Sequence, residues 1–187
     1  MLKKIIASSI AASLLFSGSL LAKGPKAPAE DSIAAIVTAL ATAEDPADRE
    51  FTVLYSLLGA TGLATVLDEG GQFTVFAPTD AAFAPLVAAG ALDGLSIAQV
   101  ANVLLYHVTD GRRWSNSVVN RSNSKSIEML NEEFVFVQPD KSIMDTNDIN
   151  DTVLLLEDAK IAVPDVNASN GVIHIIDQVL LPASLLD

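Results

Sequence analysis

The chain has 187 residues, half of them hydrophobic, and a formal charge of −12 with an isoelectric point near 4.4. This length and apolar content predict one domain with a single core and exclude a chain that is disordered throughout. The acidic balance disfavours nucleic acid and anionic membranes as partners, because both are polyanions. Since the sequence has no cysteine, it excludes disulfides, thiolate nucleophiles and cysteine-bound metals.

Residues 1–22 have the layout of a secretory signal peptide, with two lysines, an apolar run and a small-residue region. We expect cleavage near Ala22, or alternatively at Ser19, and a secreted, periplasmic or cell-surface protein. The apolar run is shorter than a bilayer span requires, so we expect no stable membrane insertion after cleavage. Residues 23–31 are rich in proline and predict a linker, and residues 32–187 predict a single domain.

The first half of this domain predicts helices, because its apolar residues recur at helical spacing. One helix begins at Ile33, with Ser32 or Asp31 as its cap, and a second begins near Phe51. Gly62 ends or bends the second helix before one further turn. Each helix therefore presents one apolar face to a core.

The stretch FTVFAPTDAAF, Phe73–Phe83, predicts a strand that leads directly into a helix. Pro78 ends the strand because it lacks an N–H and holds the preceding residue extended. Thr79 or Asp80 then caps the helix. We expect Pro85 to end this helix early, because its ring would clash with the carbonyl one turn back.

Ser96 and Gln99 form a capping box for another helix, whose apolar face consists of Ile97, Val100, Leu104 and Leu105. Beyond this helix, alternating patterns and short apolar runs predict strands. These strands lie at Phe134–Val137, Val153–Leu156, Lys160–Val163 and Val172–Ile176. Helices followed by strands, without regular alternation, predict an α+β domain with a mainly antiparallel sheet.

Three segments resemble the conserved boxes of the fasciclin domain family, in the family's order and at its separations. They are FTVFAPTDAAF (Phe73–Phe83), LLYHV (Leu104–Val108) and SNGVIHIIDQVLLP (Ser169–Pro182). The resemblance implies a fasciclin-like fold, which is a twisted, mainly antiparallel β wedge with helices packed against it. It also implies a single-domain secreted protein of bacterial type, in a family associated with cell adhesion and contact with the extracellular matrix.

The last box predicts a strand that is apolar on both faces except for His174, as expected of a central strand. Asn170 and Gly171 precede it and predict a tight turn with positive φ. We therefore interpret this box and the first one as determinants of the fold.

Little in the sequence predicts catalysis or a cofactor. His107 and His174 lie in apolar runs, as expected of core imidazoles with satisfied ring nitrogens. Hydrolase and phosphate-loop signatures are absent, and a triad of Ser115, His107 and Asp110 has no support beyond its residue types. We expect a non-catalytic protein without cofactor or bound metal. A periplasmic small-ligand-binding or enzymatic domain is the alternative.

The acidic segment Asp145–Asp151 is the best candidate for a cation site, because its oxygen donors alternate as in calcium loops. Its pattern departs from the EF-hand at Ile149, Asn150 and Leu156, which stand where a ligand, a glycine and the bidentate glutamate belong. A solvated loop with Asx turns is the other interpretation.

Candidate partner-binding residues follow from the resemblance. Relatives carry integrin-binding Asp-Ile segments before the last box, and Asp165 and Val166 match that position, with an expected exposed carboxylate. Tyr106 and His107 match a second reported contact, which requires that they are not buried. The segment from Arg112 to Trp114, expected to be exposed, is a third candidate. The predicted partner is a surface or matrix protein or a glycan.

Overall fold

A computed structural model describes residues 31–69, 71–119, 122–144 and 159–185. Four predicted features lie outside the described residues. They are the signal peptide 1–22, nearly all of the linker 23–31, the acidic segment Asp145–Asp151 and the strand Val153–Leu156. Among the residues described, no helix combines the length and the apolar character needed to cross a membrane.

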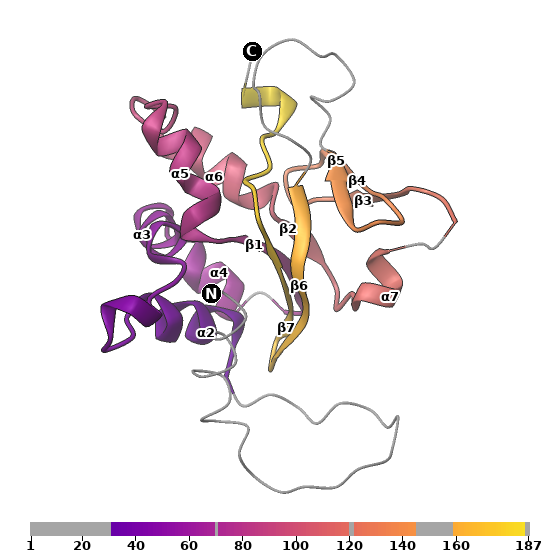
Figure 1. Cartoon of the computed structure of the whole chain (residues 1–187), viewed down its shortest axis with the longest axis horizontal. Coiled ribbons are helices and arrows are strands. Elements are labelled where there is room, and N and C mark those ends of the chain that lie inside the picture. The colour runs from indigo at the N-terminus through magenta and orange to yellow at the C-terminus, as the bar shows by residue number, and fades with distance from the viewer. Residues whose placement is uncertain (1–30, 70, 120–121, 145–158, 186–187) are drawn as a thin grey trace, which may run out of the picture.

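The first half of the domain is helical (Figure 1). Its elements are α2 (Ile33–Ala41), η1 (Pro46–Asp48), α3 (Thr52–Thr61), α4 (Leu63–Glu69), α5 (Asp80–Ala88) and α6 (Ile97–Leu105). The predicted caps are confirmed: Ser32 Oγ accepts from Ala35 N–H, and both bonds of the Ser96–Gln99 capping box are present. Gly62, with a φ of 72°, ends α3.

Two helix predictions are wrong. The helix α5 continues to Ala88, beyond Pro85, although Thr79 caps its start as predicted. Pro85 costs the helix one backbone hydrogen bond and some strain, but the buried Phe83 and Leu86 on either side of it pack into the core and hold the helix in place. Ile97 is 67% exposed and does not belong to the apolar face of α6.

The N-termini of α3 and α5 lie next to each other. A carboxylate at or just before the start of each helix accepts hydrogen bonds from N–H groups at the start of the other. Asp80 accepts from the N–H groups of Thr52 and Val53 at the start of α3, and Glu50 accepts from Asp80 N–H at the start of α5. Negative groups at helix N-termini are favourable. Burial raises the pKa of Glu50, and the nearby Asp80 charge acts in the same direction.

Within the described residues, seven strands form one sheet in the order β2-β1-β7-β6-β5-β4-β3. Their bounds are β1 (Phe73–Pro78), β2 (Val108–Asp110), β3 (Lys125–Glu128), β4 (Phe134–Val137), β5 (Ser142–Met144), β6 (Ala159–Ala168) and β7 (Gly171–Ile176). Only β1 and β7 pair in parallel, so the predicted α+β fold with a mainly antiparallel sheet is confirmed. The sheet nearly closes, because Leu130 N–H donates to Val108 O on β2.

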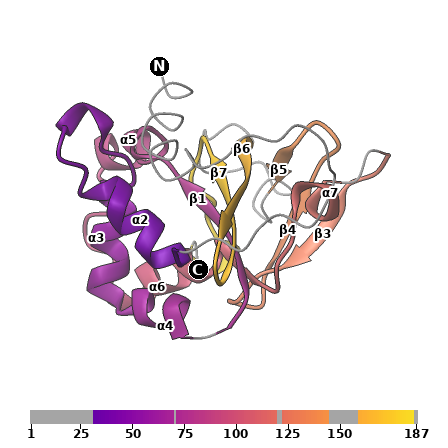
Figure 2. The same ribbon diagram turned by 90° about the horizontal axis from the view of Figure 1, so that it is seen from below.

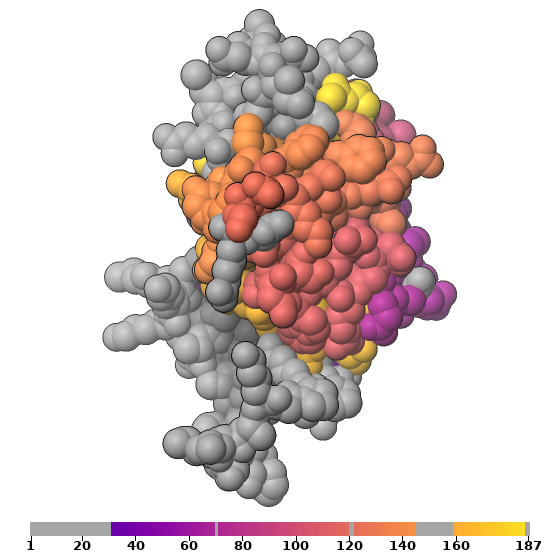
Figure 3. Space-filling view, turned by 90° about the vertical axis from the view of Figure 1, so that its right-hand side faces the viewer, coloured from indigo at the N-terminus to yellow at the C-terminus, as the bar shows by residue number. Residues whose placement is uncertain are grey.

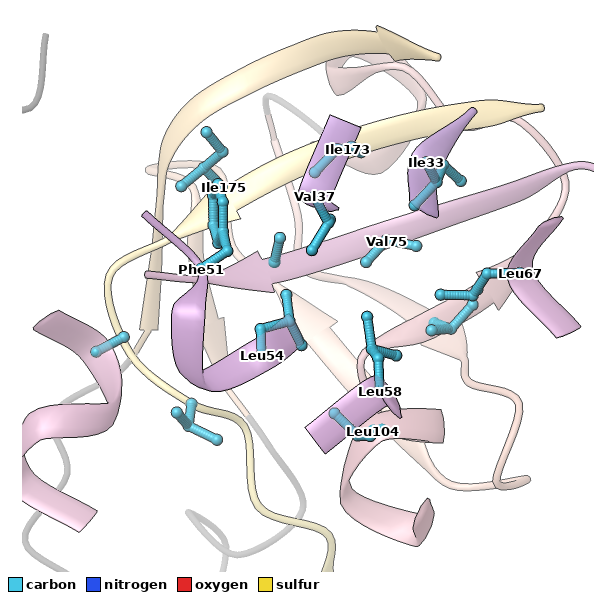
Figure 4. Packing of buried hydrophobic residues seen from close by; sticks show 14 of the residues in the cluster. Ile33, Val37, Phe51, Leu54, Leu58, Leu67, Val75, Leu104, Ile173 and Ile175 are labelled. Atoms are coloured by element: carbon cyan, nitrogen blue, oxygen red, sulfur yellow. The ribbon is translucent and has the colours of Figure 1, made fainter. Parts of the chain in front are cut away.

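The strands β1 and β7 lie between the helices and the strands β3, β4 and β5 (Figure 2). They separate two cores, so the expectation of a single core is wrong. On the helical side, Val37, Leu54 and Leu58 pack on Val75, Ile173 and Ile175 (Figure 4). On the other side, Phe76 and Ile176 pack against β3, β4 and β5, which curve over them. Figure 3 looks onto this second part, where orange strands lie beside the pink segment that carries α7 (Ser115–Val118). Every residue of β1 and β7 is buried, so the predicted central position of β7 is confirmed.

The turn before β7 differs from the prediction, because neither Asn170 nor Gly171 has a positive φ. Glycine is required at position 171 for close approach. A Cβ there would lie 2.1 Å from the Phe73 carbonyl oxygen and 2.6 Å from Ile33 Cδ1. Asn170 Oδ1 accepts from Ile33 N–H and its amide donates to Leu67 O, so the turn holds α2 and α4 against the sheet.

Candidate functional site

Tyr106 and His107, at the end of α6, are buried. Tyr106 is fully buried, and its hydroxyl donates to Phe134 O at 3.0 Å. The His107 ring donates from Nδ1 to Val103 O at 2.7 Å and accepts at Nε2 from Leu180 N–H at 2.9 Å. Burial lowers the pKa of His107 to about 4, although the Val103 carbonyl opposes this. His107 is therefore the satisfied, neutral core imidazole that the sequence predicted.

Asp165 belongs to a connected group of hydrogen-bonded residues, the polar seam, which consists of Thr74, Arg113, Ser115, Asp165 and His174. Asp165 has a φ of 63° and lies where the register of β6 against β7 shifts between Val163 and Val166. Its Oδ1 accepts from Ser115 N–H at 2.7 Å, and its Oδ2 accepts from Ser115 Oγ at 2.6 Å. The carboxylate thus caps α7, so the expectation of a freely exposed Asp165 is wrong.

The rest of the polar seam joins β1, β7 and the segment before α7. His174 Nδ1 accepts from Asp165 N–H at 3.2 Å, and its Nε2 donates to Arg113 O at 2.9 Å. Thr74 Oγ1 accepts from Arg113 N–H and donates to Gly111 O. Burial lowers the pKa of His174, while the Arg113 carbonyl and the Asp165 charge oppose this. His174 is therefore held as a neutral link between strands.

The polar seam is not arranged for nucleophilic catalysis. Ser115 Oγ donates to the Asp165 carboxylate, and both ring nitrogens of His174 are bound to backbone groups. An activated serine needs a base within hydrogen-bond reach. The triad of Ser115, His107 and Asp110 considered from the sequence does not form, because the His107 ring is hydrogen-bonded to the backbone of Val103 and Leu180. Over the described ranges, no three His, Asp or Glu side chains are grouped to hold a metal ion.

Arg112 and Trp114, beside the seam, are half-buried and do not have the free exposure expected of them. The Arg112 guanidinium lies 6.0 Å from the centre of the Trp114 ring. It donates to Gln72 Oε1, Asn167 Oδ1 and the carbonyls of Ala168 and Ser169. Arg112 thereby holds the turn between β6 and β7. Val166 is also half-buried and packs against the core on the helical side.

Sequence reasoning missed a cavity of about 190 Å³ between α3, α5, α6 and the chain that follows β7. Its lining is apolar except for His107. A signal was present in the segment Ala88–Gly94, whose small residues cannot fill the space that the flanking helices enclose. The predicted partner residues Asp165 and Val166 do not line this cavity.

Comparison with known proteins agrees with this architecture. A FAS1 domain pair from the insect cell adhesion molecule Fasciclin I superposes with a TM-score of 0.61 at 16% identity. The superposition covers 85% of this chain and 53% of that chain. It shows that the fold is shared.

Sequence relatives identify the family. The uncharacterized protein sll1735 of Synechocystis sp. is 34% identical over 136 residues, which cover 72% of this chain and 91% of that protein. The pig transforming growth factor-beta-induced protein ig-h3 is 33% identical over 137 residues, which cover 72% of this chain and 18% of that protein. The fasciclin domain itself matches residues 49–182. The resemblance found in the three sequence boxes is thereby confirmed, and the chain belongs to the fasciclin domain family.

Proposed function

We propose that this chain is a secreted, non-catalytic interaction module that binds a surface or matrix protein or a glycan. In this proposal a leader (1–22) and a linker (23–31) precede one fasciclin domain (32–187), located in the periplasm or at the cell surface. The family supports an adhesive role, since the insect structural neighbour is described as a cell adhesion molecule. The small-ligand-binding alternative has one separate observation in its favour, which is the cavity beside α6.

We place the partner contact on a β6 patch, which consists of Arg112, Trp114, Asp165, Val166 and Asn167. All five residues are partly exposed. Arginine and tryptophan are frequent anchors of interfaces, and the hydrogen bonds of Arg112 and Asp165 hold the patch in one geometry. A rigid patch loses little conformational entropy on binding. This preordered patch is the observation that carries the proposal.

Tyr106 and His107, the other predicted contact, have a different place in this proposal. Because both side chains are buried, a partner would reach them only if the end of α6 opened. We therefore propose that they support the core from which the β6 patch projects.

Replacing Asp165 by Asn tests the proposal, because it removes the charge but keeps an oxygen that can accept from Ser115. The purified protein, its Asp165→Asn variant and a matched control would be immobilised and tested for saturable binding to whole cells, matrix proteins and glycans. Asp140→Asn is the control, because Asp140 Oδ1 also accepts from a serine, through Ser142 N–H and Oγ, but lies in an exposed turn.

Three outcomes are informative. Loss of binding in Asp165→Asn, with Asp140→Asn unchanged, would support the β6 patch. Ser115→Ala then separates two roles for Asp165, since it removes one hydrogen bond and leaves the carboxylate available to a partner. Binding that Asp165→Asn and Trp114→Ala both retain would contradict the placement. Absence of saturable binding to any surface would contradict the function.

A further inference from the structure

The cavity beside α6 has a buried floor and a partly exposed mouth. Its floor includes Phe83, Leu86, Val103, Leu104, Val179 and Leu181, which are buried members of the core on the helical side. Its mouth is surrounded by Leu57, Ala91, Leu92, Leu95, Val100 and Leu185, which are partly exposed. Protein interiors seldom leave voids larger than a water molecule, and this hollow of about 190 Å³, although open at its mouth, extends among buried core residues.

The lining offers no free polar side chain among the described residues. His107 is the one polar side chain among the described lining residues, and both of its ring nitrogens are already bound to backbone groups. A ligand would therefore gain no hydrogen bond from the lining side chains, and any buried polar group on it would be left unsatisfied.

Charges near the mouth disfavour anionic amphiphiles. No lysine or arginine occurs in α3, α5, α6, the connection 89–96 or the segment 178–185, whereas Asp93 lies in that connection. A carboxylate or phosphate head group would meet no counter-charge there, in a protein with a net charge of −12. A fatty acid is therefore a poor match, and an uncharged molecule is a good one.

The wall formed by the C-terminal segment is held in place without a ligand. Leu180 N–H donates to His107 Nε2, Ala183 N–H donates to Glu133 Oε2, and Asn102 donates to Ser184 Oγ. These bonds connect the segment to α6 and to the turn before β4. The cavity is therefore preformed, as small-molecule sites usually are.

We propose that this cavity binds an uncharged, apolar small molecule the size of a single ring or a short alkyl chain. A comparable apolar cavity of about 150 Å³ holds benzene, and this one is somewhat larger. The site does not overlap the β6 patch and does not depend on the proposed function. Binding there stabilises the folded chain, because the ligand interacts with the folded state alone.

The first experiment is a calorimetric titration of the full chain with toluene, an uncharged apolar molecule with a single ring. We expect saturable binding. Octanol should displace the bound molecule, whereas octanoate at pH 7 should not. Absence of saturable binding would overturn the proposal. Equal displacement by octanol and octanoate would overturn the assignment to uncharged ligands.

Two matched pairs of variants locate the bound toluene. Ala91→Phe places a ring at the mouth, whereas Ala89→Phe adds the same ring to an exposed position that does not line the cavity. On α6, Val100→Phe and Ile97→Phe form a second pair, since Val100 lines the cavity and Ile97 is exposed. We expect binding to weaken about tenfold or more in Ala91→Phe and Val100→Phe alone.

Circular dichroism identifies any variant that does not fold. If one pair contains such a variant, the binding measured for the other pair decides the test. Unchanged affinity in a folded Ala91→Phe or Val100→Phe protein would overturn the proposal. Equal weakening in the variants and their matched controls would overturn it as well.

Discussion

The polar seam lies on the side of β1 and β7 that faces the second core, whereas the cavity lies among the helices on the other side. The two regions are built in opposite ways. In the seam, Asp165, Ser115 and both ring nitrogens of His174 have hydrogen-bond partners within the chain. In the cavity, space is left unfilled and the lining is apolar. The polar residues that attract attention in the sequence are therefore used to hold the fold. This hollow is lined by alanine, leucine, valine and other apolar residues, which carry no chemical signature in the sequence.

The largest effect should come from breaking the wall that separates these two regions. Gly171→Ala places a Cβ 2.1 Å from the Phe73 carbonyl oxygen, so β1 and β7 must move apart. We expect urea denaturation to show a loss on the order of 4 kcal/mol in the free energy of unfolding. Gly59→Ala is the control, because nothing lies within 4 Å of its added Cβ in α3, and it should be neutral or slightly stabilising. Equal stability of the two variants would contradict the close approach.

Lowering the pH should weaken the cavity side through His107. The pKa of His107 is about 4 in the folded protein, against 6.5 for an unperturbed histidine. This group therefore contributes stability above pH 6.5 that is lost as the pH falls from 6.5 to 4, by roughly 3 kcal/mol in all. Urea denaturation of the protein and of His107→Gln at several pH values measures the difference.

The comparison with His107→Gln is needed because other groups titrate in the same range. His174 contributes with the same sign, since its pKa is also lowered. Glu50 contributes with the opposite sign, since its pKa is raised and its protonated form is favoured in the folded protein. A His107→Gln protein with the pH profile of the unsubstituted chain would show that His107 is not the group responsible.

On the seam side, a smaller and more local effect is expected from Asp165→Ala. The substitution removes two hydrogen bonds at the start of α7, as in the loss of a helix cap, which costs about 1 to 2 kcal/mol. Hydrogen exchange should accelerate at the amide of Val119, which donates to Ser115 O, and stay unchanged at the amide of Tyr106, which follows α6 and donates to Asn102 O. Acceleration throughout the domain would show that the seam supports the global fold.

The smallest effect should come from filling the cavity. Ala91→Leu adds apolar volume at the mouth and should raise the free energy of unfolding by about 0.5 to 1 kcal/mol. Ala89→Leu, at an exposed position, should leave it unchanged. Thermal denaturation of the two variants compares them. A loss of stability in Ala91→Leu would indicate that the space is not available to a side chain.

Local interactions were the ones that the sequence predicted well. The cap at Ser32, the capping box at Ser96 and the end of α3 at Gly62 each depend on residues within one helical turn. The burial of β7 followed from its composition, since a strand with apolar residues on both faces must lie inside a sheet. The family also followed from the sequence, through three boxes that match it in order and spacing.

Predictions failed where distant segments meet. Pro85 remains within α5 because Phe83 and Leu86 beside it pack into a core built from distant segments, and Gly171 is required by the Phe73 backbone, which is remote in sequence. The carboxylate of Asp165 was expected to be free, but Ser115, 50 residues away, binds it. None of these partners can be identified from the residues next to each site.

The sequence by itself determined the helices with their caps, the central strand, the family and the acidic surface. These follow from backbone periodicity, hydrogen bonding within a turn and net charge, which need no knowledge of distant neighbours. Only the tertiary structure decided which polar residues are satisfied internally and where space remains between elements. Both depend on how α3, α5, α6 and the C-terminal segment pack against one sheet, and packing is a property of the assembled chain.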